Sequence, residues 1–264
     1  MIIDSHAHCF PDALAPRAIA KLAPDYNPTP IFDGTVDGLL AALDRDGIDR
    51  CFVLNVATNA HQQDKVNAFA AQINRYRDRI YAFGSLHPDH PDVMGAAKRM
   101  KEAGLFGVKI HPDFLGMEID DRRMDPVFAA CCEYGLPLVI HSGYDPAYAS
   151  HIHAKPQTTA NVLARFPALR LCCAHFGDAK DPEAVLKYLC GKNVWFDTGF
   201  TGLGLSPQDA RRILDNHDEN KVMFGTDLPW EAPSVTLRYL RSLSLSEERL
   251  EKNYHTNAEA FLKM

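Results

Sequence analysis

The sequence of 264 residues lacks the features that mark several large classes of protein. No apolar run approaches the roughly 20 residues that a membrane-spanning helix needs, and residues 1–8 lack the basic and apolar segments of a secretory signal. Lys and Arg total 28 against 34 Asp and Glu, which gives a net charge of −6 and no basic surplus for nucleic acid. The sequence therefore predicts neither a nucleic-acid partner nor a membrane partner.

The cysteines do not form the patterns of a disulfide framework. There are seven of them, an odd number, with two adjacent pairs and no Cys-x-x-Cys. We interpret this as a reduced, cytoplasmic protein. Internal repeats, low-complexity tracts and linkers are also missing, so we expect residues 1–264 to form one domain.

Short apolar runs, rich in β-branched and aromatic residues, recur about one strand–helix unit apart. The eight predicted strands are residues 2–3, 51–54, 80–83, 107–110, 136–140, 169–173, 194–196 and 222–224. Stretches with helical periodicity separate most of them, at residues 36–43, 92–103, 125–134, 158–166 and 182–189. This alternation predicts an α/β protein with a parallel sheet, which is either an open doubly wound sheet or a closed barrel.

Polar side chains decide between these two sheets, because they follow the strand candidates and seldom precede them. The residues in question are His6, His8, Asn55, His87, His111, His141, His175, Asp197 and Asp227. In a closed barrel all strand carboxyl ends share one rim, so residues distant in sequence meet in one site, whereas an open sheet spreads them along an edge. We therefore predict a (β/α)₈ TIM barrel, for which this length is typical.

His6 and His8 belong to the segment Asp-Ser-His-Ala-His at the end of the first predicted strand. Side chains alternate faces along a strand, so the two imidazoles project the same way and can bind one metal ion. A His-x-His segment alone is weak evidence in a chain with 12 histidines, but His141 and His175 end two consecutive strands and strengthen it. In a closed barrel the last strand neighbours the first, so Asp227 is expected beside His6 and His8.

Together these segments resemble the amidohydrolase superfamily, in particular its amidohydrolase-2 branch of barrel hydrolases and decarboxylases. The resemblance covers essentially the whole chain and rests on residues 4–8, 107–112, 135–141, 174–177, 224–227 and 257–261. It implies that His6, His8, His141 and Asp227 hold one divalent ion, zinc in the first place and manganese as an alternative. It also implies that His175 polarises the substrate or steers its water.

Lys109 and His111 are assigned to substrate binding. In other branches of the superfamily a lysine on strand four is carbamylated and bridges two metals, and Lys109 lies near that place. Here Lys109 with His111 is interpreted as a wall for an anionic or carbonyl-bearing substrate, the alternative being a buried lysine paired with a carboxylate. Trp230 either stacks on the substrate or covers the barrel mouth, and Asp197 is interpreted as an acceptor that fixes a loop.

The stretch from residue 10 to residue 33 shows no regular helical pattern. It contains five prolines, namely Pro11, Pro16, Pro24, Pro28 and Pro30. Because it follows the first strand, we expect it to cover the rim as a lid or substrate wall, unless it is only a packed surface loop. Cys9 is left out of the site because it is out of register with His6 and His8.

These residues predict a metal-dependent hydrolase of a small ester, lactone or amide. A metal lowers the pKa of its bound water to about 7, Asp227 would take and return the proton, and His175 would stabilise the oxyanion. One alternative is a non-oxidative decarboxylase of a small carboxylic acid on the same scaffold; the compact chain favours hydrolysis. Another is a non-catalytic metal- or ligand-binding barrel. The expected partner is a small molecule, and a homodimer stays open.

Overall fold

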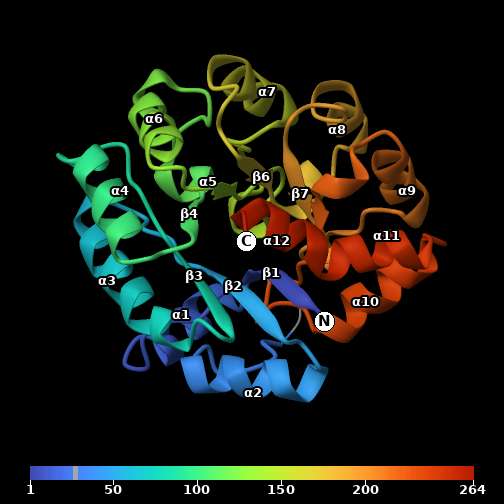
Figure 1. Ribbon diagram of the computed structural model, residues 1–264, viewed down its shortest axis with the longest axis horizontal. Helices are drawn as coiled ribbons and strands as arrows, with labels where there is room; N and C mark the ends of the chain where they lie inside the picture. Colours follow the sequence, from blue (N-terminus) through green and yellow to red (C-terminus); the bar gives the residue numbers. More distant parts are fainter. Residues whose placement is uncertain (26–28) are drawn as a thin grey trace.

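A computed structural model describes residues 1–25 and 29–264, in which eight parallel strands alternate with helices around a central axis (Figure 1). The strands are β1 (Ile3–Ala7), β2 (Arg50–Leu54), β3 (Ile80–Gly84), β4 (Gly107–Ile110), β5 (Leu138–Ile140), β6 (Leu171–Cys173), β7 (Trp195–Asp197) and β8 (Val222–Met223). Each pairs in parallel with the next, in the order β1 to β8. Every one of the eight predicted apolar runs contains part of a strand, so the α/β prediction is confirmed.

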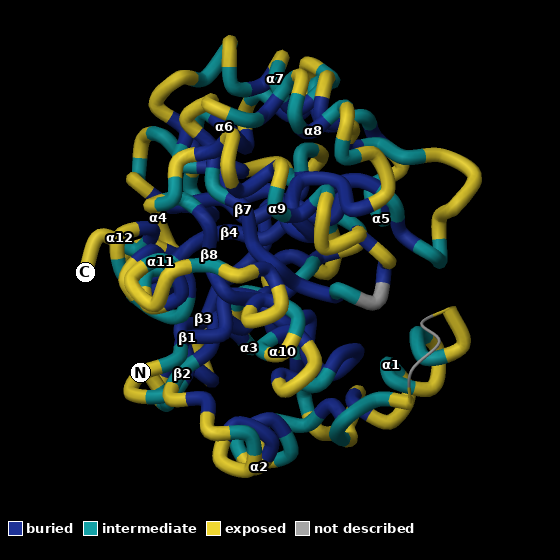
Figure 2. Tube along the Cα trace, turned by 90° about the vertical axis from the view of Figure 1, so that its right-hand side faces the viewer, coloured by how far each residue is buried: buried dark blue, intermediate teal, exposed yellow. Residues whose placement is uncertain are grey.

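The helices surround this sheet. They are α1 (Ala15–Leu22), α2 (Val36–Asp46), α3 (Gln63–Ile73), α4 (Val93–Glu102), α5 (Pro112–Leu115), α6 (Asp125–Glu133), α7 (Pro156–Arg165), α8 (Pro182–Tyr188), α9 (Pro207–Asp215), α10 (Pro233–Ser242), α11 (Glu247–Glu251) and α12 (Asn257–Leu262). Figure 2 shows buried strands inside and exposed outer faces on the helices. Gly47 follows α2 with a φ of 68°, and Gly135 lies two residues after α6 with a φ of 61°. Both have the left-handed conformation that favours glycine.

Backbone hydrogen bonds between the first and last strand regions close the sheet into a barrel. The N–H of Ser5 donates to the carbonyl of Phe224 at 2.8 Å, and the N–H of Asp227 donates to the carbonyl of His6 at 2.8 Å. A parallel bridge between Ala7 and Leu228 continues this contact. The predicted TIM barrel is thereby confirmed, and with it the proximity of Asp227 to the end of β1.

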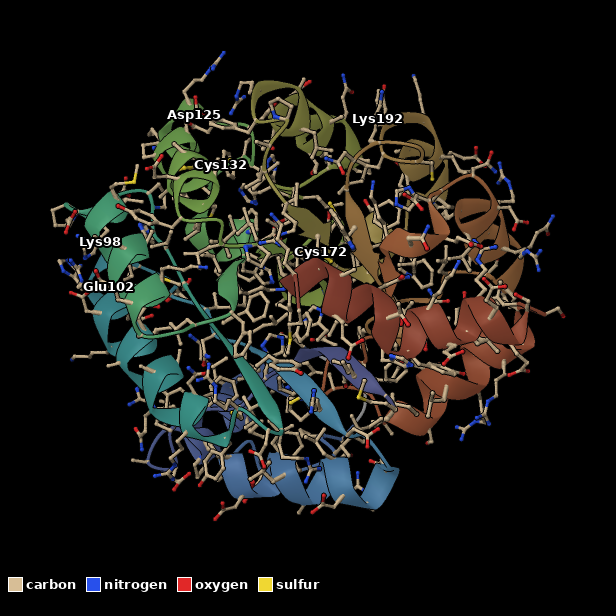
Figure 3. The ribbon with its side chains drawn as sticks, viewed as in Figure 1. Lys98, Glu102, Asp125, Cys132, Cys172 and Lys192 are labelled. Atoms are coloured by element: carbon tan, nitrogen blue, oxygen red, sulfur yellow. The ribbon has the colours of Figure 1, made fainter. Side chains whose placement is uncertain are left out.

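Large side chains fill the barrel interior. Phe52 and Phe83 stack with ring centroids 5.1 Å apart, and Phe52 also stacks on Phe261 of α12 at 6.4 Å. Helix α12 crosses the middle of the view in Figure 1, with Cys172 of β6 beside it in Figure 3. Because α12 packs at the end of the barrel where the strands begin, the opposite end is left for a site.

The proline-rich stretch differs from its sequence prediction, because residues 15–22 form helix α1. Pro16 stands in the first turn of α1, where a helix tolerates proline because that N–H has no partner within the helix. Pro28 lies outside the described residues. The described part of the chain contains no helix long and apolar enough to cross a membrane. All seven cysteines are free thiols.

Candidate active site

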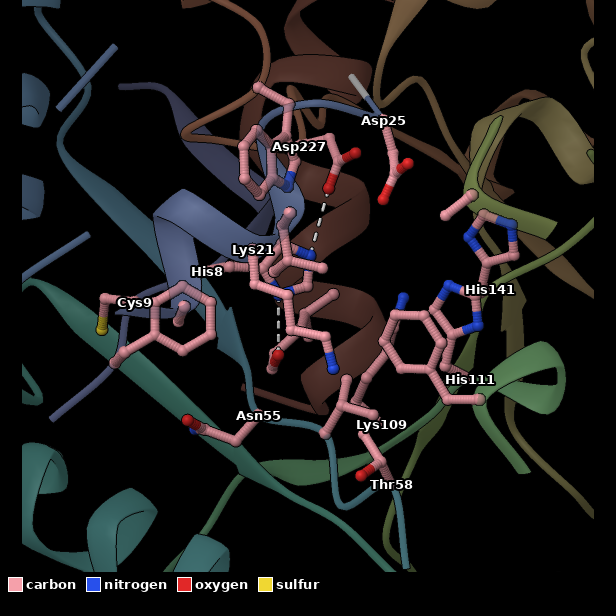
Figure 4. Close-up of a pocket in the computed structure, with 18 of the residues that line it drawn as sticks. His8, Cys9, Lys21, Asp25, Asn55, Thr58, Lys109, His111, His141 and Asp227 are labelled. Carbon is pink, nitrogen blue, oxygen red and sulfur yellow. Dashed lines mark hydrogen bonds and ion pairs between the residues drawn. The ribbon is translucent and has the colours of Figure 1, made fainter. Parts of the chain in front are cut away.

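A pocket of about 860 Å³ opens at the end of the barrel where the strands finish (Figure 4). All the residues predicted to act in catalysis, metal binding or substrate binding line it. They are His6, His8, Lys109, His111, His141, His175, Asp227 and Trp230. The structure thus brings the whole predicted set into one space, while the role of each residue remains a prediction.

His6, His8 and Asp227 form one compact group in this pocket. Asp227 Oδ1 lies 3.3 Å from His6 Nε2 and 3.1 Å from His8 Nε2. The opposite nitrogens face acceptors: His6 Nδ1 lies 2.9 Å from Asp197 Oδ2, and His8 Nδ1 lies 2.9 Å from the carbonyl of Leu54. A carbonyl oxygen can only accept a hydrogen bond, so His8 Nδ1 carries a hydrogen. The Asp197 carboxylate is also an acceptor, so His6 Nδ1 carries a hydrogen as well.

This arrangement fits a cation. Burial, followed by the neighbouring Lys109 ammonium, lowers the pKa of His6 well below its ordinary value, so His6 is neutral and its Nε2 carries a lone pair. Nε2 of His6 and Oδ1 of Asp227 are then two acceptors in contact, with His8 Nε2 beside them. Three converging acceptors repel one another unless a positive ion lies between them, and imidazole with carboxylate is a ligand set for zinc or manganese.

Asp227 retains its negative charge in this surrounding. Burial raises the pKa of the Asp227 carboxyl, but a proton added to this group goes to an imidazole before it goes to the carboxylate, so the pKa of Asp227 is lowered overall. The backbone of Asp227 is left-handed, with φ of 65°, and that of His175 likewise, with φ of 56°. Non-glycine residues in this region store strain that the surrounding contacts must offset, which is common at functional sites.

Asp197 was interpreted from the sequence only as an acceptor that fixes a loop. The structure gives it that function, since its Oδ1 accepts the N–H groups of His175 at 3.0 Å and Gly199 at 2.9 Å. Its Oδ2 also contacts His6 Nδ1, so Asp197 additionally orients a predicted metal ligand. The signal available in the sequence was the position of an acidic residue directly at a strand end.

His141 does not join the His6, His8 and Asp227 group among the described residues. Its Nδ1 lies 3.2 Å from His175 Nε2, and its ring stacks on His111 with centroids 4.0 Å apart. Its Nε2 points instead toward Asp145, whose Oδ2 is 3.9 Å away, and His111 Nε2 lies 3.0 Å from the same oxygen. The assignment of His141 as a ligand of the same ion as His6, His8 and Asp227 therefore stays a prediction.

Lys109 is a buried cation beside the histidines. Its side chain is 1% exposed and its Nζ lies 3.4 Å from His6 Nε2. Burial lowers the pKa of Lys109, while Asp197 and Asp227 raise it in part. Within the described residues no carboxylate oxygen forms an ion pair with Lys109, so the alternative of a lysine paired with a carboxylate in direct contact is not what the structure has.

The remaining walls of the pocket are mostly apolar or aromatic. They include Phe10, Phe69, Phe114, Tyr148, Phe200 and Trp230. Helix α1 also lines the pocket, so the stretch expected to be a lid or a substrate wall is a wall. Cys9 lines it too, but burial raises its thiol pKa to about 12, which keeps the sulfur protonated. His87 does not line this pocket; its backbone N–H donates to Gln63 Oε1 at 2.6 Å.

The sequence model of the Amidohydrolase family matches residues 3–264. The chain belongs to the amidohydrolase family. The structure agrees with this membership, because His6 of β1, His8 just after β1 and Asp227 after β8 converge as the resemblance implies. The protein is therefore a barrel that belongs to a family of enzymes, and its clusters of histidine and aspartate are suited to a divalent metal.

The proteins similar to this amidohydrolase whose names state an activity include three decarboxylases. A decarboxylase from Emericella nidulans is 24% identical over 285 residues, covering 86% of this chain and 85% of its own. The solved 5-carboxyvanillate decarboxylase of Novosphingobium aromaticivorans, with bound manganese and 3-methoxy-4-hydroxy-5-nitrobenzoic acid, is 17% identical with a TM-score of 0.76 over 100% of this chain and 97% of its own. A 2,6-dihydroxybenzoate decarboxylase from Rhizobium is 16% identical, with a TM-score of 0.72 over 99% and 98% of the two chains.

Proposed function

We propose that this amidohydrolase catalyses the metal-dependent, non-oxidative decarboxylation of a hydroxylated aromatic carboxylic acid. Hydrolysis was the first prediction from the sequence, and decarboxylation its alternative. The compact chain was the argument for hydrolysis, but the alignments cover 85% of the Emericella decarboxylase and 97% of the Novosphingobium enzyme, so length does not separate the two reactions. We take residues 1–264 as one catalytic domain.

The observation that carries this proposal is the buried Lys109. An ammonium group held in a pocket with no carboxylate in an ion pair, within the described chain, is costly unless a ligand supplies the negative charge. A substrate carboxylate between Lys109 Nζ and the His6, His8 and Asp227 group would supply it. The aromatic walls of the pocket suit a flat ring attached to that carboxylate.

A divalent ion bound by His6, His8 and Asp227 would supply positive charge that fixes the carboxylate or a neighbouring hydroxyl group of the substrate. The protein must then add one proton to the ring carbon that bears the carboxylate. The bond from that carbon to the carboxylate breaks, its electron pair restores the aromatic ring, and carbon dioxide leaves. One proton is consumed for each carbon dioxide released.

His175 and Asp227 are the two candidates for the donor of this proton. As a ligand of the ion, Asp227 would have its carboxylate oxygen engaged, so we assign the proton to His175, whose ring lies outside the His6, His8 and Asp227 group. His175 Nδ1 lies 2.9 Å from the carbonyl of Gly199, which fixes the ring and leaves Nε2 to face the pocket side and His141. A positioned general acid contributes about 10²- to 10⁴-fold in rate.

The test is a screen of hydroxybenzoates and aromatic dicarboxylic acids with Mn²⁺- or Zn²⁺-loaded protein, measuring carbon dioxide release. We expect turnover of at least one hydroxylated aromatic acid, and a loss of about 100-fold or more in kcat for His175→Gln. Lys109→Met should raise KM. Lys192→Met, a change of an exposed lysine far from the pocket (Figure 3), is the matched control. Hydrolysis of esters or lactones without any carbon dioxide release would overturn the proposal.

A further inference from the structure

The mouth of the pocket carries more positive charge than the reaction at Lys109 requires. Among the described residues that line the pocket, the basic ones are Arg17, Lys21, Lys65 and Lys109, while the acidic ones are Asp25 and Asp227. Asp227 belongs to the histidine group, which leaves Asp25 as the one acid beside three further cations. This local excess is opposite in sign to the net charge of −6 of the whole chain.

Two of these cations come from the same face of helix α1. Arg17 and Lys21 are four residues apart, so their side chains lie side by side along α1, and both line the pocket together with Leu14 and Ala18. Like charges at this spacing destabilise a helix slightly. Figure 4 shows Lys21 drawn in the same pocket as Lys109 and Asn55.

The third cation, Lys65, comes from α3 and lines the same pocket. Within the described chain, no carboxylate forms an ion pair with Arg17, Lys21 or Lys65. All three residues are exposed, and together they place positive charge from two helices around one opening.

The size of the pocket also favours a substrate that is longer than one aromatic ring with one carboxylate. A volume of about 860 Å³ is near the upper end of the range, roughly 300–1,000 Å³, in which pockets hold drug-sized ligands. A benzoate with one ring and one carboxylate, bound at Lys109, would fill only part of this space. A longer substrate with a second negative group would fill the remaining space and contact the mouth cations.

We propose that the substrate is a dianion: one carboxylate binds at Lys109, and a second anionic group on the far side of the molecule binds to Arg17, Lys21 and Lys65. The inference rests on the proposed function for the identity of the first anion. The mouth cations determine specificity and take no part in the bond-breaking step.

The test compares two rigid probes, biphenyl-4,4′-dicarboxylate and biphenyl-4-carboxylate, by isothermal titration calorimetry with the Mn²⁺-loaded protein. We expect the dicarboxylate to bind about tenfold more tightly, as for one added charge-assisted contact. The double variant Arg17→Met with Lys21→Met should remove that preference and leave the monocarboxylate unaffected. The preference should also shrink at high salt, whereas Lys192→Met should preserve it.

Equal binding of the two probes by the unmodified protein, or a preference that survives in the double variant, would overturn the inference. Because binding is measured without turnover, the two proposals fail separately. A preference for the dicarboxylate that depends on Arg17 and Lys21 supports the inference even if no acid in the screen releases carbon dioxide. Decarboxylation of monoanions with no preference for a dianion would refute the inference and leave the proposed function standing.

Discussion

At the scale of single residues, the contact between Asp197 Oδ2 and His6 Nδ1 decides which imidazole nitrogen can bind a metal. With a hydrogen held on Nδ1, the lone pair of Nε2 faces Asp227. If Nδ1 lost this acceptor, the hydrogen could move to Nε2, and the ring could no longer act as a ligand. Asp197 is thus a positioning residue for the proposed metal site.

Replacing Asp197 with Asn should weaken metal binding, because the amide has a single acceptor oxygen. If that oxygen accepts the N–H groups of His175 and Gly199, the NH2 group faces His6 Nδ1, which needs an acceptor. Loss of such an orienting partner typically costs about 10- to 100-fold in metal affinity. Equilibrium dialysis with Zn²⁺ or Mn²⁺ measures the effect, with far-ultraviolet circular dichroism to check folding. Asp37→Asn, on the exposed face of α2, serves as control. An unchanged affinity in the folded Asp197→Asn protein would refute the positioning role.

The sequence predicts the meeting of His6, His8 and Asp227 because two simple rules suffice: alternation along a strand, and adjacency of the first and last strands in a closed barrel. It does not predict where a side chain after a strand points. His175 leaves its strand with a left-handed backbone, and the direction of the His141 ring depends on its stacking against His111. These are properties of loop conformation and packing, which residue order alone does not determine.

At the scale of elements, helix α1 explains why the prediction for residues 10–33 was incomplete. Frequent proline suggested irregular chain, but Pro16 occupies the first turn of the helix and leaves the remainder undisturbed. The expectation that this stretch would form a wall rested on its place after the first strand, and that expectation is met. The connection that follows a barrel strand lies at the rim whatever its secondary structure.

His217, after helix α9, links that helix to the barrel. Its Nε2 lies 3.0 Å from the carbonyl of Val194, its Nδ1 accepts the N–H of Gly191 at 3.3 Å, and its ring packs on Phe196. Burial lowers the pKa of His217 from 6.5 to about 4. The folded protein therefore holds this imidazole neutral under conditions in which the unfolded chain would protonate it.

The buried His217 imidazole should make the stability of the protein sensitive to acid. Between pH 6.5 and about 4 the unfolded state binds the additional proton, so stability falls as the pH falls, by about 2 kcal/mol at pH 5. Urea unfolding at pH 7 and pH 5 measures the change. His217→Gln should be less stable at pH 7 but should lose less on acidification. Identical losses in both proteins would show that His217 does not titrate as expected.

At the scale of the whole molecule, the barrel is closed by polar contacts as well as by the sheet. The buried carboxylate of Asp4, on β1, accepts hydrogen bonds from both the backbone N–H and the hydroxyl group of Thr226, which follows β8. These contacts join two segments 222 positions apart and stand next to Asp227. Asp4 and Thr226 therefore support both the closure of the barrel and the position of the neighbouring Asp227.

Thr226→Val should destabilise the fold, because it removes a hydrogen bond to the buried carboxyl group of Asp4, whose pKa burial raises to about 7. Leaving a buried polar group without its partner costs about 1–3 kcal/mol. The free energy of unfolding in urea measures this loss, and metal affinity should fall with it because Asp227 is adjacent. The same substitution at exposed Thr256 should change stability by less than about 0.5 kcal/mol. A Thr226→Val protein as stable as the parent would show that the sheet alone closes the barrel.

The contact of His8 with Asp227 also has a consequence for protein synthesis. The two residues are 219 positions apart, one near the start of the barrel and the other just beyond its last strand. A chain emerging from the ribosome therefore carries the first half of its cation-binding group from the outset but cannot complete it until β8 has been translated. Nascent or prematurely terminated chains that stop before β8 should be inert, which confines any activity to finished molecules.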